Sequence, residues 1–337
     1  MARRALIVGG SGQIGRAVCR RLVGDGWSVT AAQKRPERVP AELTADGVMT
    51  IALDREAPGA LAKAVGGGFD AVIDTVAYDE GHARQLLAIE SDVGALVVIS
   101  SGSVCCDEAG RTLDEAATHG FPDFPVAIPE DQPTVAPGPA TYSTRKAALE
   151  TALLQGSRRP VTILRPFAIH GEGSDHVREG WFVRRILDGR RRIPLAYAGG
   201  SRFHTTATAN LAELVSVALD QPATRVLNAA DPQALNVLQI GQVIAHHFGA
   251  DVEFVTFDGP PRGGVGATPW SVPAPIVADL SRAEALGYRP VGAYEQTVAA
   301  ACRAAEAMVA AGEPFIPYIE AMFDYAAEDR FLVGGGE

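Results

Sequence analysis

Residues 5–15 read Ala-Leu-Ile-Val-Gly-Gly-Ser-Gly-Gln-Ile-Gly, a short apolar run that stops at glycines and turns at once into an amphipathic segment. This pattern predicts a buried strand, a tight turn and a helix. Such a turn gathers backbone N–H groups and the positive end of the helix dipole, which suits a diphosphate. Gly9 allows the tight turn, Gly12 lets a phosphate approach, and Gly15 lets helix and strand pack closely. The stretch predicts a dinucleotide-binding unit; the alternative is a glycine-rich turn without a ligand.

Composition limits the class of protein. The 337 residues are 47% hydrophobic and 21% charged, which is enough for one large or two modest domains. The formal net charge of −10 argues against a nucleic-acid partner. No run approaches the roughly 20 apolar residues of a membrane span, and the basic N-terminal segment has too short an apolar run for a signal peptide. We therefore expect a cytoplasmic protein with no membrane partner.

The cysteines do not form a recognisable framework. No two have Cys-x-x-Cys spacing, and an adjacent pair makes a poor disulfide and a poor zinc site. We expect reduced thiols and no metal site. The four cysteines are Cys19, Cys105, Cys106 and Cys302.

Apolar runs alternate with helical patterns through the first half of the chain. This alternation predicts an α/β fold with a Rossmann-type, doubly wound parallel sheet, whose ligands lie beyond the carboxyl ends of the strands. The predicted strands are Ala5–Val8, Ser28–Ala31, Val48–Leu53, Ala71–Thr75, Leu96–Ser100 and Val161–Arg165. The predicted helices are Gln13–Val23, Pro58–Val65, His82–Ile89 and Tyr142–Leu154.

Two departures from this alternation define the domains. Residues 107–139, called the excursion below, contain several prolines and predict either a lid or pocket wall, or an irregular surface loop. After His170 the pattern becomes mainly helical, with one further strand expected at Asp251–Phe257. We expect residues 1–170 to form the dinucleotide-binding domain, with elements of about 205–235 packing back on it. Residues 171–204 and 236–330 are expected to form a smaller, mainly C-terminal substrate-binding α/β subdomain. The helices predicted after His170 are Trp181–Leu187, Leu211–Leu219, Leu238–Phe248, Ala293–Ala311 and Pro314–Ala327.

Tyr142 and Lys146 stand four residues apart at the start of a predicted helix and so share one face. A tyrosine is a poor base at neutral pH, but a nearby ammonium stabilises the phenolate and lowers its pKa. Tyr142 would then exchange a proton with an alcohol or a carbonyl oxygen. The alternative is an ordinary surface pair.

Ser100-Ser101-Gly102-Ser103 directly follows a predicted strand, where the sheet presents its ligands. A hydroxyl there can hold a reacting oxygen against the tyrosine. The alternative is that these serines only satisfy loop backbone groups. A serine nucleophile is disfavoured because no Gly-x-Ser-x-Gly elbow surrounds them.

These residues, in this order, resemble the extended short-chain dehydrogenases/reductases of the nucleotide-sugar epimerase/dehydratase kind. The resemblance extends to about residue 305. Its matching segments are Gly9-x-x-Gly12-x-x-Gly15, Asp54, Thr75-Val76-Ala77, Ser101-Gly102-Ser103-Val104, Tyr142 with Lys146, Leu164–Gly171, Val226–Asp231 and Asp279–Arg282.

The resemblance implies roles for individual residues. The catalytic residues are Ser101, Tyr142 and Lys146. The cofactor contacts are Gly9, Gly12, Gln13, Ile14, Gly15, Gln33, Lys34, Arg35, Leu53, Asp54, Ala77, Tyr142, Lys146, Pro166, Phe167 and Ala168. The substrate contacts are Ser103, His170 and Arg202.

The chain also departs from the family pattern. No asparagine matches the one that often completes the catalytic set. Gly102-Ser103 stands where the dehydratases have Asp-Glu, which weighs against sugar dehydration. His170 replaces a usual tyrosine, Asn210 replaces an aspartate, and Arg202 is shifted by one position from the usual diphosphate-binding arginine.

The end of the second predicted strand bears on the choice of cofactor. An acid there would bind the ribose hydroxyls of NAD, whereas basic residues would accept a 2′-phosphate. Gln33 occupies the position of the acid, and Lys34 and Arg35 follow it. The sequence favours NADP, with NAD as the alternative.

We therefore expect an NAD(P)-dependent reductase or epimerase acting on a small or nucleotide-linked, sugar-like alcohol or carbonyl. A catalytically silent cofactor-binding protein, or an RNA-associated member of the superfamily, is the alternative. Helices of this fold often pair across a two-fold axis, so the analogy suggests a homodimer.

Overall fold

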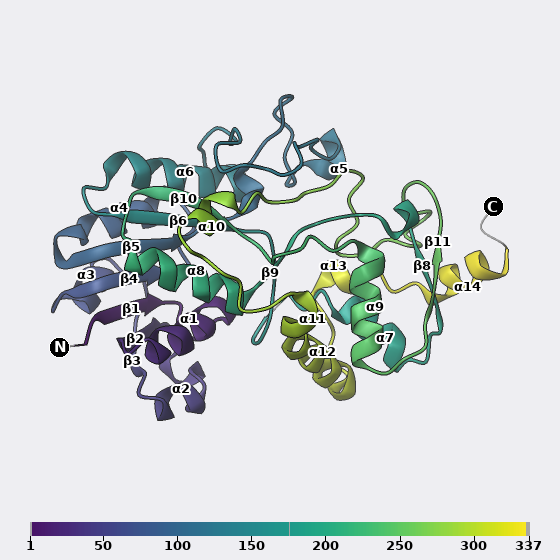
Figure 1. The fold of residues 1–337 in the computed structure, drawn as a ribbon, viewed down its shortest axis with the longest axis horizontal. Coiled ribbons are helices and arrows are strands. Elements are labelled where there is room, and N and C mark those ends of the chain that lie inside the picture. The colour runs from purple at the N-terminus through teal and green to yellow at the C-terminus, as the bar shows by residue number, and fades with distance from the viewer. Residues whose placement is uncertain (1, 175, 335–337) are drawn as a thin grey trace. The chain divides into compact units, whose positions relative to one another are not determined.

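The computed structural model describes residues 2–174 and 176–334 (Figure 1). The chain divides into two compact units. Unit 1 contains Met1–Phe167, Thr208–Ala230 and Ala278–Val291. Unit 2 contains Ala168–Ala207, Asp231–Val277 and Gly292–Glu337. Within the described residues, no helix is long and apolar enough to cross a lipid bilayer.

Unit 1 is built on a seven-stranded sheet of order β10-β6-β5-β4-β1-β2-β3, in which all the pairings are parallel. The strand order reverses between β1 and β4, which is where open α/β sheets bind ligands. The strands are β1 (Arg4–Val8), β2 (Ser28–Gln33), β3 (Met49–Ala52), β4 (Phe69–Asp74), β5 (Val93–Ile99), β6 (Val161–Pro166) and β10 (Arg225–Ala229). The fold class expected from the sequence is confirmed, and every predicted strand of this sheet is present.

Helices cover both faces of the sheet because its strands are apolar on both faces. Leu6 and Val8 of β1 pack in a core cluster with Leu86 and Leu149, while Ile7 between them is also fully buried. Helix α1 packs against α8, and α4 packs against α6 (Figure 1). The helices of unit 1 are α1 (Gln13–Gly24), α2 (Ala41–Ala45), α3 (Ala60–Val65), α4 (Glu80–Ala88), α5 (Ala116–His119), α6 (Tyr142–Gly156), α8 (Thr208–Asp220) and α10 (Ser281–Ala285).

The glycines after β1 are required by the geometry of the turn. Gly9 has φ +87°, a conformation that side chains rarely adopt. A Cβ on Gly15 would lie against the carbonyl oxygen of Gly9 and 2.7 Å from Cα of Gly10. Close packing of α1 on β1 therefore needs glycine at both positions.

Unit 2 contains two small parallel sheets, β7 with β9 and β8 with β11, and a helical layer. Trp181, Phe182 and Trp270 lie in its buried core. The elements are β7 (Ala168–His170), α7 (Gly180–Leu187), β8 (Arg192–Leu195), β9 (Thr205–Ala207), α9 (Val237–His247), β11 (Glu253–Thr256), α11 (Tyr294–Thr297), α12 (Ala299–Ala311), α13 (Pro317–Glu320) and α14 (Tyr325–Val333).

Helix α14 was not expected from the sequence beyond residue 327. Its N-terminus is capped by Asp324, whose carboxylate accepts the N–H of Ala327 at 2.9 Å. Its Glu328 pairs at 2.5 Å with Arg185, a guanidinium that is fully buried and lies 3.6 Å from the ring centroid of Trp181. A long-range ion pair therefore fixes this helix, and local sequence patterns do not reveal such a contact.

Residues 278–291 belong to unit 1, whereas the sequence analysis grouped them with the second region. Long-range hydrogen bonds explain the difference. Asp279 donates its N–H to the carbonyl of Ile128 at 2.9 Å, and its own carbonyl accepts from the amide of Asn228 at 3.2 Å.

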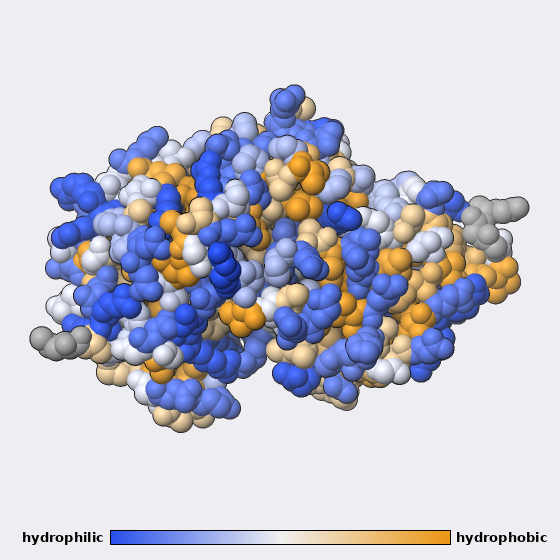
Figure 2. Space-filling view, viewed as in Figure 1, coloured by the Kyte–Doolittle hydropathy of each residue, from blue (hydrophilic) through white to orange (hydrophobic). Residues whose placement is uncertain are grey.

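Exposed hydrophobic side chains are scattered over the face in view (Figure 2). Figure 2 shows hydrophilic residues around scattered hydrophobic patches on the visible face. Exposed large apolar side chains such as Met49, Val126 and Val291 come from separate parts of the chain. The homodimer stays a prediction.

Candidate active site

Ser101 lies two residues after the end of β5, at the carboxyl edge of the sheet. Its Oγ accepts hydrogen bonds from the N–H of Ser103 at 3.1 Å and from Ser103 Oγ at 2.9 Å. With two acceptor positions used, the Ser101 proton can still be donated. The next residue, Gly102, lies against Phe167, where an added Cβ would come within 2.7 Å of the ring. A side chain at position 102 would therefore overlap the Phe167 ring.

Tyr142 is the first residue of α6. Thr141 and Thr144 form a capping box, in which the Thr144 N–H donates to Thr141 Oγ1 at 3.2 Å and the Thr141 N–H donates to Thr144 Oγ1 at 2.8 Å. The residue as a whole is 41% exposed, and its ring tilts against Tyr78 with 5.7 Å between ring centroids. The cap fixes the helix start, and the Tyr78 ring supports one side of the phenol.

Lys146 lies one turn further along α6 and is 5% exposed. Its Nζ donates to the carbonyl oxygens of Ala77 at 2.6 Å and Ile99 at 3.0 Å. Burial lowers the pKa of Lys146 to about 8, although the negative charges of Asp74 and Glu150 oppose this shift. The amine is therefore held between the ends of β4 and β5.

The expected lowering of the Tyr142 pKa by Lys146 is not what this arrangement gives. Burial raises the pKa of Tyr142, and only its interaction with the Ser101 hydroxyl lowers it. The Lys146 ammonium lies 5.8 Å from the Tyr142 ring centroid and directs its hydrogen bonds to backbone carbonyls. The pair shares one helix face, as predicted, but the phenol favours its protonated form.

The sequence patterns did not reveal a buried ion pair between Arg55 and Asp74, whose charges act on Lys146. Asp74, at the end of β4, accepts from Arg55 Nη1 at 2.6 Å and from the N–H of Val76 at 3.0 Å. Both charged side chains are at most 8% exposed. The pair fixes the bend that presents the Ala77 carbonyl to Lys146. A carboxylate at the end of an apolar strand was the available signal.

The turn after β1 has the features of a phosphate cradle. Thr75 binds the end of β1 through its Oγ1, which donates to the carbonyl of Val8 at 2.9 Å. No described side chain caps the N-terminus of α1, so its first-turn amides stay open to an anion.

Gln33 ends β2 beside this turn and is 7% exposed. In the part of the chain that is described, neither its amide oxygen nor its amide nitrogen has a hydrogen-bond partner. Unpaired buried amide groups are costly, and a ligand hydroxyl or phosphate would satisfy them. The neighbouring Lys34 pairs with Asp54 at 2.9 Å, and this contact lowers the pKa of Asp54.

Most of the predicted site residues belong to unit 1, and most of them lie at the carboxyl ends of its strands. These are Gly9, Gly12, Gln13, Ile14 and Gly15 after β1, Gln33, Lys34 and Arg35 at β2, Leu53 and Asp54 after β3, Ala77 after β4, Ser101 and Ser103 after β5, Tyr142 and Lys146 on α6, and Pro166 and Phe167 at β6. Ala168, His170 and Arg202 belong to unit 2.

His170 has the environment of a structural histidine. It is 2% exposed, and its Nε2 lies 2.9 Å from Asp231 Oδ2, which also accepts from Thr205 Oγ1 at 2.6 Å. Burial opposes the charged imidazole, but the hydrogen bond and charge of Asp231 outweigh it and raise the pKa of His170. A substrate contact by His170 stays a prediction, as does one by the exposed Arg202.

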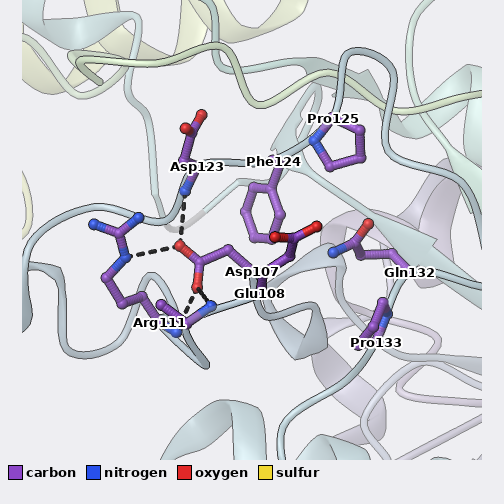
Figure 3. A pocket seen from close by; sticks show the side chains of 9 residues that line it. Asp107, Glu108, Arg111, Asp123, Phe124, Pro125, Gln132 and Pro133 are labelled. Atoms are coloured by element: carbon purple, nitrogen blue, oxygen red, sulfur yellow. Dashed lines mark hydrogen bonds and ion pairs between the residues drawn. The ribbon is translucent and has the colours of Figure 1, made fainter.

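The excursion lines a cavity of about 660 Å³, a size typical of small-molecule sites (Figure 3). Asp107 organises its wall by accepting hydrogen bonds from the N–H groups of Ala109, Arg111 and Asp123, and from Arg111 Nε at 2.7 Å. The other lining residues are Glu108, Phe124, Pro125, Gln132 and Pro133.

Comparison with known proteins gives the family. A model of the NAD dependent epimerase/dehydratase family matches residues 5–230. The chain belongs to this family. The matched region includes the β1 turn, Ser101, Tyr142 and Lys146. No match was found among curated protein sequences.

Solved structures, epimerases among them, share the fold. A putative epimerase from Burkholderia cenocepacia is 22% identical, with a TM-score of 0.65 over 90% of this chain and 98% of that one. UDP-glucose 4-epimerase from Thermotoga maritima, solved with UDP-glucose, is 18% identical, with a TM-score of 0.67 over 91% and 99% of the two chains. MoeE5, solved with UDP-glucose and NAD, is 18% identical, with a TM-score of 0.65 over 91% and 99%. At these identities the similarity establishes the epimerase/dehydratase fold alone.

Proposed function

We propose that the protein is an NADP-dependent reductase or epimerase that acts on a small or nucleotide-linked, sugar-like alcohol or carbonyl. One observation carries the proposal. The buried amine of Lys146 bonds the carbonyls of Ala77 and Ile99, two residues before Ser101, and lies one helical turn from Tyr142. A phenol, an ammonium and a hydroxyl are thus tied to adjacent strand ends in one unit.

These three groups support proton transfer. A nicotinamide cofactor, when bound, supplies the acceptor or donor of a hydride. Tyr142 then takes the proton of a substrate alcohol, or gives its own to a carbonyl oxygen. Ser101 donates a hydrogen bond to the same oxygen, and the Lys146 ammonium, 5.8 Å from the Tyr142 ring centroid, lies near the negative charge that develops there during transfer.

The residues present fit a dinucleotide. The unpaired amide of Gln33, the last residue of β2, and the uncapped N-terminus of α1, which follows β1, lie at the carboxyl ends of two adjacent strands. Lys34 and Arg35 are exposed cations next to Gln33, which supports NADP. Because Lys34 pairs with Asp54, a 2′-phosphate would compete with that carboxylate for the ammonium.

A nucleotide-linked substrate is supported by the fold relatives solved with UDP-sugars. The replacement of an acidic pair by Gly102-Ser103 argues for reduction or epimerisation over dehydration. The four cysteines are buried free thiols, which supports a reducing compartment such as the cytoplasm.

The experiment is a turnover assay on the purified full chain. NADPH and NADH oxidation are followed with a panel of carbonyls, and UDP-sugars are incubated with NADP or NAD and analysed for epimers. Turnover of one substrate class that is lost in Tyr142→Phe and kept in Tyr318→Phe, an exposed tyrosine of unit 2, supports the proposal. Cofactor binding without turnover, or RNA binding that weakens steeply with salt, would favour the silent or RNA-associated alternative.

A further inference from the structure

The excursion reaches the first turn of the helix that begins with Tyr142. Asp114 Oδ2 accepts the backbone N–H of Ser143 at 2.7 Å. Ser143 is fully buried and directly follows Tyr142. We propose that Asp114 positions Tyr142 by bonding the first turn of α6 and by keeping a negative charge beside the phenol. This inference rests on the proposed function, because it gives Tyr142 the proton-transfer role.

The contact completes the cap of α6. The capping box satisfies the N–H of Thr144 through Thr141, but it leaves that of Ser143 to another acceptor. The carboxylate of Asp114 supplies this acceptor, and an anion at a helix N-terminus also interacts favourably with the helix dipole. Asp114 lies 29 residues before Ser143 in the sequence, so the cap comes from a separate segment of the chain.

The segment that carries Asp114 is held in place at both ends. Asp107 closes the turn just before it through the hydrogen bonds drawn in Figure 3. The N–H of Cys106 donates to the carbonyl of Pro133 at 2.9 Å, and that of Val135 donates to the carbonyl of Val104 at 2.9 Å. The excursion therefore joins the Ser101 turn to the start of α6.

The charged side chains around Tyr142 have opposite signs and come from different segments of the chain. Asp114, on the excursion, is exposed and disfavours the phenolate. Lys146, on α6, lies 5.8 Å from the ring centroid. Tyr78 contacts the Tyr142 ring, and the guanidinium carbon of Arg145 lies 5.5 Å from the centroid of the Tyr78 ring. Asp114 is the carboxylate in this group, so its removal shifts the balance toward the phenolate.

The test uses the full chain and needs no substrate. Asp114→Asn keeps an oxygen that can accept the Ser143 N–H but removes the charge, and Asp114→Ala removes both. Each variant is titrated by the ultraviolet absorbance of tyrosinate, and the same protein with Tyr142→Phe is subtracted to isolate Tyr142. Hydrogen exchange of the Ser143 amide reports the helix start. Glu115→Gln is the matched control, because Glu115 is adjacent and exposed and faces His119 at 3.7 Å.

We expect the Tyr142 titration to move down by roughly 0.3–0.5 pH unit in both Asp114 variants, as for the loss of one exposed charge. Exchange at Ser143 should rise about five-fold in Asp114→Ala, the loss of a typical cap, and little in Asp114→Asn. Glu115→Gln should change neither. An unshifted titration in Asp114→Asn would overturn the inference, even if Asp114→Ala fails to fold. If the titration shifts but Tyr142→Phe retains full turnover, the proposed function fails and the positioning contact stands.

Discussion

The Lys146 ammonium donates a hydrogen bond to the carbonyl oxygen of Ile99 at 3.0 Å, which joins α6 to the last residue of β5. Because Ser101 follows two residues later, this bond fixes the distance between the helix that carries Tyr142 and the turn that carries the serine. The site is thus assembled by a side chain that bonds the backbone, and Lys146 has a structural role in addition to its charge.

Replacing Tyr142 with phenylalanine should lower turnover at least about 100-fold, because the proton donor is lost. Cofactor affinity should stay within about two-fold, since the ring and the helix start remain. Steady-state kinetics and a fluorescence titration with NADPH measure the two quantities, with Tyr318→Phe as control. Unchanged turnover would remove Tyr142 from the mechanism.

Carbonyl reduction should be fastest on the acid side and fall as pH rises through about 8. Burial lowers the pKa of Lys146 to about 8, so its ammonium is present below that pH and lost above it. Tyr142 has a raised pKa and stays a proton donor over this range. The Lys146→Arg variant keeps its positive charge above pH 8. Whatever turnover this variant retains should therefore begin to fall only at a higher pH. A flat profile between about pH 7 and 9 would contradict the assignment.

Lys34→Ala should weaken NADP binding about ten-fold and leave NAD binding within about two-fold, because one phosphate contact is lost. Isothermal titration at two salt concentrations measures this, and the difference should shrink at high salt. Arg38→Ala, on the same exposed turn, is the control. Equal losses for both cofactors would argue against a 2′-phosphate contact.

Gly102→Ala should destabilise the protein by about 1–3 kcal/mol, since the added methyl group overlaps the Phe167 ring. Denaturant unfolding followed by circular dichroism measures the loss. Gly24→Ala is the matched control, because nothing lies within 4 Å of its Cβ position. Combining Gly102→Ala with Phe167→Ala should recover part of the stability, and no recovery would place the strain elsewhere.

Asp231→Asn should cost about 2–3 kcal/mol of unfolding free energy near neutral pH. Despite its burial, the His170 contact lowers the pKa of Asp231 to about 2, below its unfolded value of about 3.9. Its stabilisation is therefore present above about pH 4 and lost as pH falls through about 2. Urea unfolding near pH 7 and pH 3 measures this, with Asp251→Asn at an exposed site as control. A cost that did not shrink at the lower pH would contradict the pairing.

The fold was largely predictable because its signals are local. Gly9, Gly12 and Gly15 mark the βα turn, and uninterrupted apolar runs mark strands buried on both faces. The candidate catalytic pair was also accessible, since Tyr142 and Lys146 have a fixed helical spacing. Contacts between segments that are distant in the sequence could not be predicted in this way. Nothing near Asp114 in the sequence indicates that it caps α6, and nothing in the predicted strand Ala71–Thr75 indicates that Asp74 pairs with Arg55.

The guanidinium of Arg185 also has a practical consequence for handling the protein. Its charge is balanced by Glu328 of α14, close to the end of the chain, and it stacks on Trp181 inside the core of unit 2. A recombinant version trimmed before Glu328 would leave an unpaired cation in an apolar interior. A purification tag should therefore be added after α14 and should not replace this helix.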